Sequence, residues 1–138
     1  MVLDTITIPA QLPCLAQGMT FVVACATAAG LPLTRVREVE LATEELLVNI
    51  CHYAYPDATG TIEIHCTQAD TQQLLLEFSD TGQPFNLLDR PEVDVPDDAE
   101  QRPVGGLGIL LIRTLVDRVT YSRTGDRNIV QFMVRLPH

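Results

Sequence analysis

The stretch that most constrains the fold is an amphipathic segment that follows Pro32 and runs to Tyr55. Its apolar side chains recur three or four positions apart, which is the spacing of a buried helix face. These positions are Val36, Val39, Thr43 (by its methyl group), Leu46, Leu47, Ile50 and Tyr53. We therefore expect one long helix with Thr34 as its N-cap, and the rest of the chain must bury its apolar face.

Two polar residues, Glu45 and Asn49, lie beside that apolar stripe. Their spacing places the two side chains one above the other on the same side of the helix. A carboxylate and a carboxamide stacked in this way form an oxygen-rich strip that can hold a hydroxyl, a water or a hard cation. An ordinary solvated helix edge has the same appearance, so only other parts of the chain can separate the two interpretations.

Size and composition indicate one domain over residues 1–138, long enough to bury a proper core. No apolar run approaches the roughly 20 residues of a membrane span, and no positively charged segment leads an apolar one at the N-terminus. We therefore expect a cytoplasmic protein. The cysteines show no CxxC spacing, which predicts free or small buried thiols rather than a zinc site or disulfides. They are Cys14, Cys25, Cys51 and Cys66.

The charged residues exclude several classes of function. A net charge of -9 disfavours nucleic acid, whose phosphates would be repelled. All nine basic residues are arginine, so the chain has neither a P-loop lysine, nor the strand lysine of eukaryotic-type protein kinases, nor a Schiff-base nucleophile. Any phosphate that binds must be neutralised by backbone amides, arginine or a metal ion.

The order of the predicted elements indicates an α+β fold. Alternation and turn residues predict strands at 3–9, 61–67, 73–80, 119–123 and 128–136, and helices at 12–29, after Pro32 and from Gly108. Helices between only some of the strands favour a two-layer sandwich, in which helices cover one face of a mixed, mostly antiparallel sheet. Residues 81–108 lack periodicity, and a loop of this length is usually functional or disordered.

Asp80 and Gly82 follow a strongly apolar strand and form a second candidate feature. Gly82 provides a tight turn without a side chain, so a flat ligand can approach the main chain. A buried carboxylate that faces a heterocycle accepts a hydrogen bond from an exocyclic amine, which favours adenine over guanine. The alternative is an ordinary Asp-x-Gly turn after a strand.

Gly105, Gly106 and Gly108 lead directly into a helix, so free backbone amides and the positive end of the helix dipole converge there. This is an anion site that needs no lysine. It is not a dinucleotide fingerprint, because the glycine spacing differs and an irregular loop rather than a strand precedes it. Glycines that serve as a hinge or in helix packing are the alternative.

Taken together and in this order, the three features resemble the N, G1 and G2 boxes of the GHKL (Bergerat-fold) ATP-binding superfamily. Within it they are similar to the stand-alone bacterial anti-sigma-factor serine/threonine kinases, and the likeness extends over essentially the whole chain. The wording of residues 45–57 and 105–117 is typical of that branch. Pro84 departs from the second glycine of much of the superfamily, which speaks against a histidine-kinase module.

The resemblance implies a site for ATP and Mg²⁺. Asn49 would bind Mg²⁺, and Glu45 would position or deprotonate the attacking hydroxyl. Asp80 would bind the adenine amino group, and Gly82 would let the ring approach. Further implied residues are the phosphate-binding glycines Gly105, Gly106 and Gly108, a lid at 86–104, and Arg102 as a clamp on the terminal phosphate.

The function that the resemblance implies is an ATP-dependent serine/threonine kinase that acts as an anti-sigma factor. It would phosphorylate a STAS-type antagonist in a partner-switching system, with a homodimer expected. The alternative is a regulatory module that senses ATP or ADP and sequesters a protein partner without kinase activity. A histidine-kinase module would need an upstream helical hairpin with a phosphoacceptor histidine, and no histidine lies upstream of Leu41.

Overall fold

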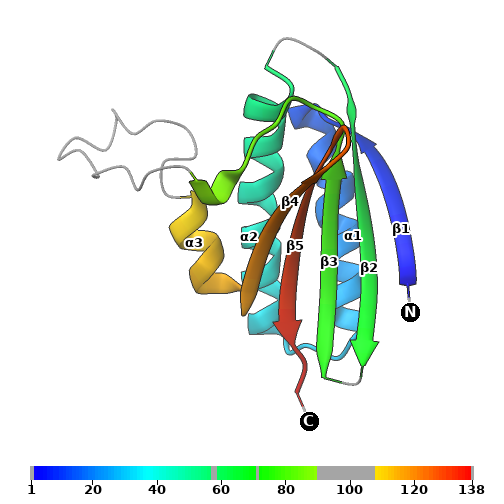
Figure 1. Ribbon diagram of the computed structural model, residues 1–138. Helices are drawn as coiled ribbons and strands as arrows, with labels where there is room; N and C mark the ends of the chain where they lie inside the picture. The colour runs from blue at the N-terminus through cyan, green and yellow to red at the C-terminus, as the bar shows by residue number, and fades with distance from the viewer. Residues whose placement is uncertain (1, 57–58, 71, 90–107, 138) are drawn as a thin grey trace, which may run out of the picture.

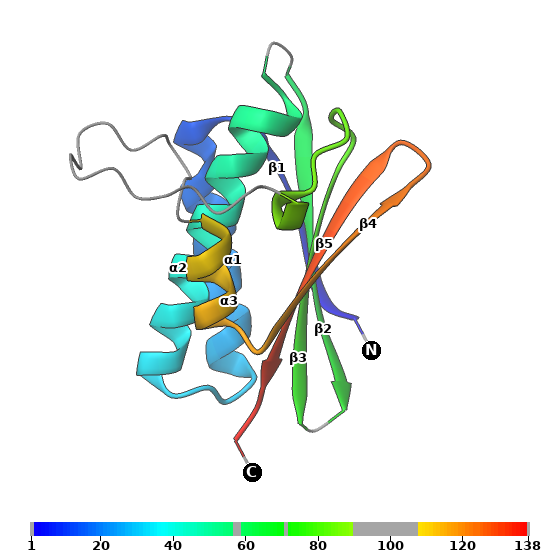
Figure 2. The ribbon, with the colours of Figure 1, turned by 60° about the vertical axis from the view of Figure 1, so that its left-hand side comes forward.

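The structure is a computed structural model that describes residues 2–56, 59–70, 72–89 and 108–137. It has two layers, in which a five-stranded sheet carries helices on one face (Figures 1 and 2). The strands lie in the order β1-β2-β3-β5-β4, and every pairing among them is antiparallel. The bounds are Val2–Pro9 for β1, Thr61–Asp70 for β2, Gln73–Asp80 for β3, Arg118–Thr124 for β4 and Arg127–Arg135 for β5.

This architecture confirms the predicted α+β sandwich with helices on one face. The described strands pair only antiparallel, whereas a mixed sheet was expected. β2–β3 and β4–β5 are hairpins, and the longer connections from β1 to β2 and from β3 to β4 place no two neighbouring described strands parallel. In the β4–β5 hairpin, Gly125 has φ +60°, a conformation that a residue without a Cβ adopts easily. The β3–β5 pairing sets Asp80 opposite Asn128, and this register matters for the site.

The helical elements follow the predicted order with two differences. Their bounds are Leu12–Cys14 for the 3-10 turn η1, Leu15–Ala28 for α1, Leu33–Asn49 for α2, Ile50–Ala54 for the π-helical η2, Leu87–Asp89 for the 3-10 turn η3 and Gly108–Leu115 for α3. The prediction of Thr34 as N-cap is wrong: Pro32 is the N-cap, and its fixed φ leads the extended chain into the helix without a side-chain cap. The long helix also widens into a π-helical segment after Asn49, a distortion common at functional sites.

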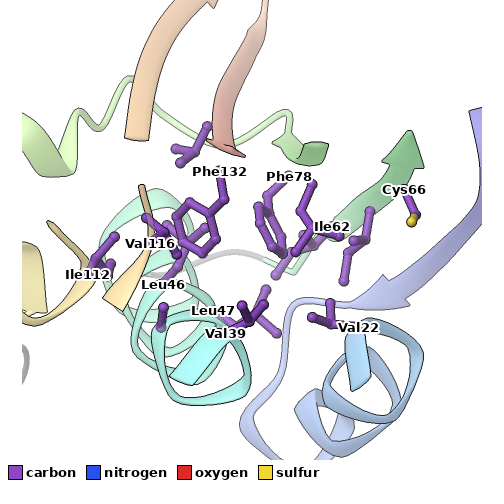
Figure 3. Close-up of a cluster of buried hydrophobic side chains, with 14 of the residues drawn as sticks. Val22, Val39, Leu46, Leu47, Ile62, Cys66, Phe78, Ile112, Val116 and Phe132 are labelled. Atoms are coloured by element: carbon purple, nitrogen blue, oxygen red, sulfur yellow. The ribbon is translucent and has the colours of Figure 1, made fainter. Parts of the chain in front are cut away.

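The core lies between the layer of helices and the sheet (Figure 3). The rings of Phe78 and Phe132 meet at its centre with centroids 5.0 Å apart, and Leu46 and Leu47 of α2 are fully buried. Burial of each such side chain contributes about 1.5–3 kcal/mol. The predicted apolar stripe of α2 is confirmed: every member is buried except Tyr53, which is half-buried.

The four cysteines are free thiols, as predicted. Cys25 of α1 and Cys66 of β2 are buried, and interaction with the Cys66 side chain lowers the pKa of Cys25. Cys14 and Cys51 are half-buried, and burial raises the pKa of Cys51 to about 11. Among the described helices, none is both long and apolar enough to cross a membrane.

Candidate functional site

Asn49, the last residue of α2, is fully buried and only partly satisfied. Its Nδ2 donates a hydrogen bond of 2.7 Å to the backbone carbonyl of Glu45. Its Oδ1 is buried and has no hydrogen-bond partner among the described residues. Leaving a buried acceptor unpaired costs about 1–3 kcal/mol, so the fold presents an amide oxygen that is ready to bind a further group.

Gly108, the first residue of α3, packs against this same part of α2. A Cβ at Gly108 would lie 2.8 Å from Oε1 of Glu45 and 3.2 Å from Nδ2 of Asn49, so only glycine fits without displacing them. The N-terminal end of α3 therefore sits directly on the carboxylate and carboxamide pair. Because the free amides and the positive end of a helix dipole lie at that end, the place where α3 meets Glu45 and Asn49 favours negative charge.

Asp80, the last residue of β3, is buried with 3% exposure. Its Oδ1 accepts two hydrogen bonds of 2.9 Å, from the backbone N–H of Gly82 and from Nδ2 of Asn128, whereas Oδ2 takes part in neither. Burial raises the pKa of the Asp80 carboxyl above its ordinary value. The two hydrogen bonds and the nearby charges of Arg123 and Arg127 act in the opposite direction.

The turn after Asp80 packs on the end of η2. A Cβ at Gly82 would lie 2.4 Å from the carbonyl oxygen of Ala54, which explains why the turn needs glycine there. Gln83 donates its backbone N–H to the Ala54 carbonyl at 2.9 Å and its Nε2 to the Tyr53 carbonyl at 2.7 Å. These are carbonyls of the helix end, which otherwise lack intrahelical partners.

Asn128 is a site residue that sequence reasoning missed. It is 2% exposed, and its Nδ2 also donates to the Gln83 carbonyl at 2.8 Å. Its Oδ1 accepts from the Phe85 N–H at 3.1 Å and from the Tyr121 hydroxyl at 2.6 Å. The signal that could have found it is the β3–β5 register, which places it opposite Asp80.

Side chains from two other segments hold the backbone of the turn. The Thr81 N–H donates to the Tyr55 hydroxyl at 2.8 Å, and Tyr55 in turn donates to the Thr61 carbonyl at 3.0 Å. Arg123 donates to the Gly82 carbonyl at 2.9 Å. These hydrogen bonds hold the main chain of the turn, and the two bonds to Oδ1 orient the Asp80 carboxylate.

An open hollow of about 440 Å³ lies beside this turn. Its walls come from the segment after α2 and from the Asp80 turn, and they comprise Ala54, Tyr55, Pro56, Thr59, Thr81, Gly82 and Gln83. A stacked pair of rings lies near the same turn, because the Tyr53 and Phe85 centroids are 5.1 Å apart at an interplanar angle of 26°.

The structure thus brings two of the predicted features to one helix. Glu45, Asn49 and Gly108 meet at the C-terminal part of α2, and the Asp80 turn packs on the η2 extension of the same helix. Glu44 is exposed, as expected for a surface residue. The predicted residues Arg102, Gly105 and Gly106, and the predicted lid at 86–104 beyond Asp89, lie outside the described residues.

Comparison with known proteins gives concordant results. Residues 8–134 match the family model of the histidine kinase-like ATPase domain. The chain is 30% identical over 122 residues to the serine-protein kinase RsbW of Listeria innocua serovar 6a, covering 83% of this chain and 76% of that protein. It is 29% identical over 120 residues to the serine-protein kinase RsbW of Listeria monocytogenes serovar 1/2a, with the same coverage. In agreement with the resemblance of its motifs to the GHKL superfamily, this chain belongs to the histidine kinase-like ATPase domain family.

Proposed function

We propose that this protein is an ATP-dependent serine/threonine protein kinase that acts as an anti-sigma factor and phosphorylates a STAS-type antagonist in a partner-switching system. Family membership and the two kinase relatives support the proposal. The observation that carries it is the buried Oδ1 of Asn49, which lacks a partner among the described residues and adjoins Glu45 and Gly108.

The Asn49 oxygen fits a Mg²⁺ ion that arrives with ATP. Mg²⁺ prefers hard oxygen ligands and is usually held by one or two protein groups together with phosphates and waters. When bound, Mg²⁺ would neutralise charge on the phosphates. The amide oxygen has no competing hydrogen bond among the described residues and is held in place by the bond from Nδ2 to the Glu45 carbonyl.

Glu45 is the group that orients the attacking hydroxyl. Its half-buried carboxylate lies at the N-terminal end of α3, next to the residue proposed to bind the metal. Phosphoryl transfer depends on placement and charge neutralisation more than on covalent chemistry, and a carboxylate there can accept the proton of the hydroxyl. Gly108, together with Gly105 and Gly106 outside the described part, would present backbone amides to the phosphates.

Asp80 is the group that reads the base. The two hydrogen bonds to Oδ1 hold the carboxylate in place, and Oδ2 accepts the hydrogen bond of the adenine amino group. Gly82 keeps the main chain bare so that the ring can approach. Arg102 as the phosphate clamp, the lid, a single domain and a homodimer complete the proposal.

The test uses labelled ATP, Mg²⁺ and a purified STAS-domain antagonist. We expect Glu45→Ala to lower label transfer by about 10²–10⁴-fold, the usual contribution of a positioned general base, while nucleotide binding persists. The matched control is Glu44→Ala, which removes the neighbouring exposed carboxylate and should transfer label at the wild-type rate.

Two results would contradict the proposal in different ways. Transfer that survives Glu45→Ala removes Glu45 from the mechanism. Nucleotide binding without transfer to any tested antagonist favours the module that senses nucleotide and sequesters its partner.

A further inference from the structure

We propose that Arg35 is a positioning residue that holds the C-terminal end of α3 and thereby sets where Gly108 meets Glu45 and Asn49. The placement of α3 follows from the contacts alone. The consequence for phosphoryl transfer rests on the proposed function.

Arg35 contacts the last residue of α3 and the residue that follows the helix by two. Its Nη1 donates a short hydrogen bond to the Leu115 carbonyl, and its Nη2 donates to Oδ2 of Asp117 at 2.8 Å. Carbonyls at a helix C-terminus lack intrahelical partners, and the dipole favours a cation at that end. The Arg35 side chain is 21% exposed, so water screens this contact less than it screens a surface ion pair.

Asp117 is itself fixed to the sheet. Its Oδ2 also accepts the backbone N–H of Arg135 at 2.8 Å, and its own N–H donates to the Met133 carbonyl at 3.1 Å. Both partners belong to β5. Arg35 therefore joins the first turn of α2 to an Asp117 side chain that is itself hydrogen-bonded to β5.

The two ends of α3 touch opposite ends of α2. Arg35 near the start of α2 binds Leu115, whereas Glu45 and Asn49 near its end meet Gly108, so the two helices lie antiparallel. Between these ends α3 buries Ile109 and Ile112, and apolar contacts of this kind are not directional. Gly108 has no side chain that could form a directional contact with α2. Among the described contacts, the hydrogen bonds of Arg35 tie the C-terminal end of α3 directly to α2, and together with the bonds of Asp117 to β5 they resist sliding of α3 along α2.

Small shifts along this axis matter at the site. One residue of helix corresponds to a rise of about 1.5 Å. A misplacement of about 1 Å in a catalytic group can cost roughly 100-fold in rate. Because a Cβ at Gly108 would already lie 2.8 Å from the Glu45 carboxylate, movement of α3 changes the room left for that side chain.

The first measurement needs neither ATP nor a partner. Hydrogen exchange of the α3 amides would be compared in the wild type, Arg35→Ala and Arg37→Ala. Arg37 is a matched control because it pairs with Glu40 on its own helix at 2.9 Å. We expect exchange in α3 to quicken by about tenfold or more in Arg35→Ala alone. Equal exchange in all three proteins would overturn the proposal.

The second measurement separates positioning from general stability by a double-mutant cycle in label transfer. We expect Arg35→Ala to slow transfer roughly fivefold, with partial recovery in Arg35→Lys, which keeps the charge but not the two-pronged geometry. Substitutions at separate, independent sites add. If Arg35 acts by placing Gly108 against Glu45 and Asn49, the double variant Arg35→Ala/Gly108→Ala slows label transfer by less than the product of the two single-variant effects.

Additive effects in the cycle would leave Arg35 as a stabilising residue only and would overturn its positioning role. If the wild type itself transfers no label, the kinase proposal fails, and the exchange experiment still decides whether Arg35 holds α3.

Discussion

Asn49 and Asn128 are both buried asparagines of the candidate site, and they differ in how far their hydrogen bonds are filled. Asn128 donates to Asp80 and Gln83 and accepts from Phe85 and Tyr121. Asn49 donates to Glu45, and its Oδ1 has no partner among the described residues. Buried polar groups are nearly always paired, so an exception calls for a specific explanation.

The difference divides the site into two halves with different dependence on ligand. The Asp80 turn is completed by protein groups alone, which preorganises the half proposed to read the base. In the half with Glu45 and Asn49, the Oδ1 atom of Asn49 is an unpaired acceptor that a bound metal would satisfy. The fold thus leaves a buried acceptor unpaired where chemistry is proposed to occur, whereas the buried asparagine in the half proposed for recognition is fully paired.

The largest expected effect comes from a matched pair of asparagine substitutions. Asn128→Leu leaves the Gln83 carbonyl, the Phe85 N–H and the Tyr121 hydroxyl without their partner, so the free energy of unfolding should fall by about 3 kcal/mol or more. Asn49→Leu loses one hydrogen bond, from Nδ2 to the Glu45 carbonyl, but also removes the buried acceptor that is already unpaired, so the free energy of unfolding should change by less than about 1 kcal/mol. Urea unfolding of both variants measures this, and equal losses would erase the contrast between the two halves.

A pair of glycine substitutions gives the next largest effect. In Gly82→Ala the new Cβ meets the backbone carbonyl of Ala54 at 2.4 Å, and backbone cannot swing aside, so stability should fall by about 1–3 kcal/mol. In Gly108→Ala the Cβ meets the flexible end of Glu45 at 2.8 Å. We expect little loss of stability but roughly tenfold slower phosphoryl transfer, since 1.4 kcal/mol in the barrier corresponds to tenfold. Thermal unfolding and label transfer measure both effects. A large loss of stability in Gly108→Ala would contradict the inference that only the flexible end of Glu45 must move to make room for the new Cβ.

The smallest expected effect is a pH dependence of nucleotide affinity. Burial raises the pKa of Asp80, so this carboxyl becomes protonated at a higher pH than an exposed aspartate. Affinity for ADP should therefore weaken on acidification, by no more than about tenfold per pH unit. The sign for stability is opposite: a raised pKa means that stability is lost as the pH rises through it, so acidification stabilises the free wild type relative to Asp80→Asn.

Calorimetric titration of ADP across pH, with Asp80→Asn as control, checks this prediction. The variant should bind ADP weakly with a flat profile. A flat profile in the wild type would show that the charge of Asp80 plays no part in binding.

Features with a local cause were predictable from the sequence. The apolar stripe of α2, the alternation in the strands and the start of α3 at Gly108 all reflect periodicity within a few residues. The N-cap was predicted wrongly because Thr34 has the better capping side chain, whereas the fixed φ of Pro32 already determines where the helix begins.

Features that depend on distant partners were not predictable. Asn128 is 48 residues from Asp80, and Arg35 is 82 residues from Asp117, so each pair exists only once the strands and helices are assembled. In the sequence an asparagine after a turn and an arginine near a helix start look like ordinary surface residues. The spacing of Glu45, Asn49, Asp80 and Gly82 was informative because each motif lies within one element and its adjoining turn.

One further consequence concerns how the helix that bears Asn49 comes to an end. The carbonyls of Tyr53 and Ala54 at the end of its π-helical extension are bonded by Gln83, a residue from a different layer. Fraying of this helix terminus and displacement of the turn after Asp80 should therefore occur together, as a single unit of local opening. A ligand that binds the Asp80 turn should therefore slow amide exchange at the end of a helix that it does not touch.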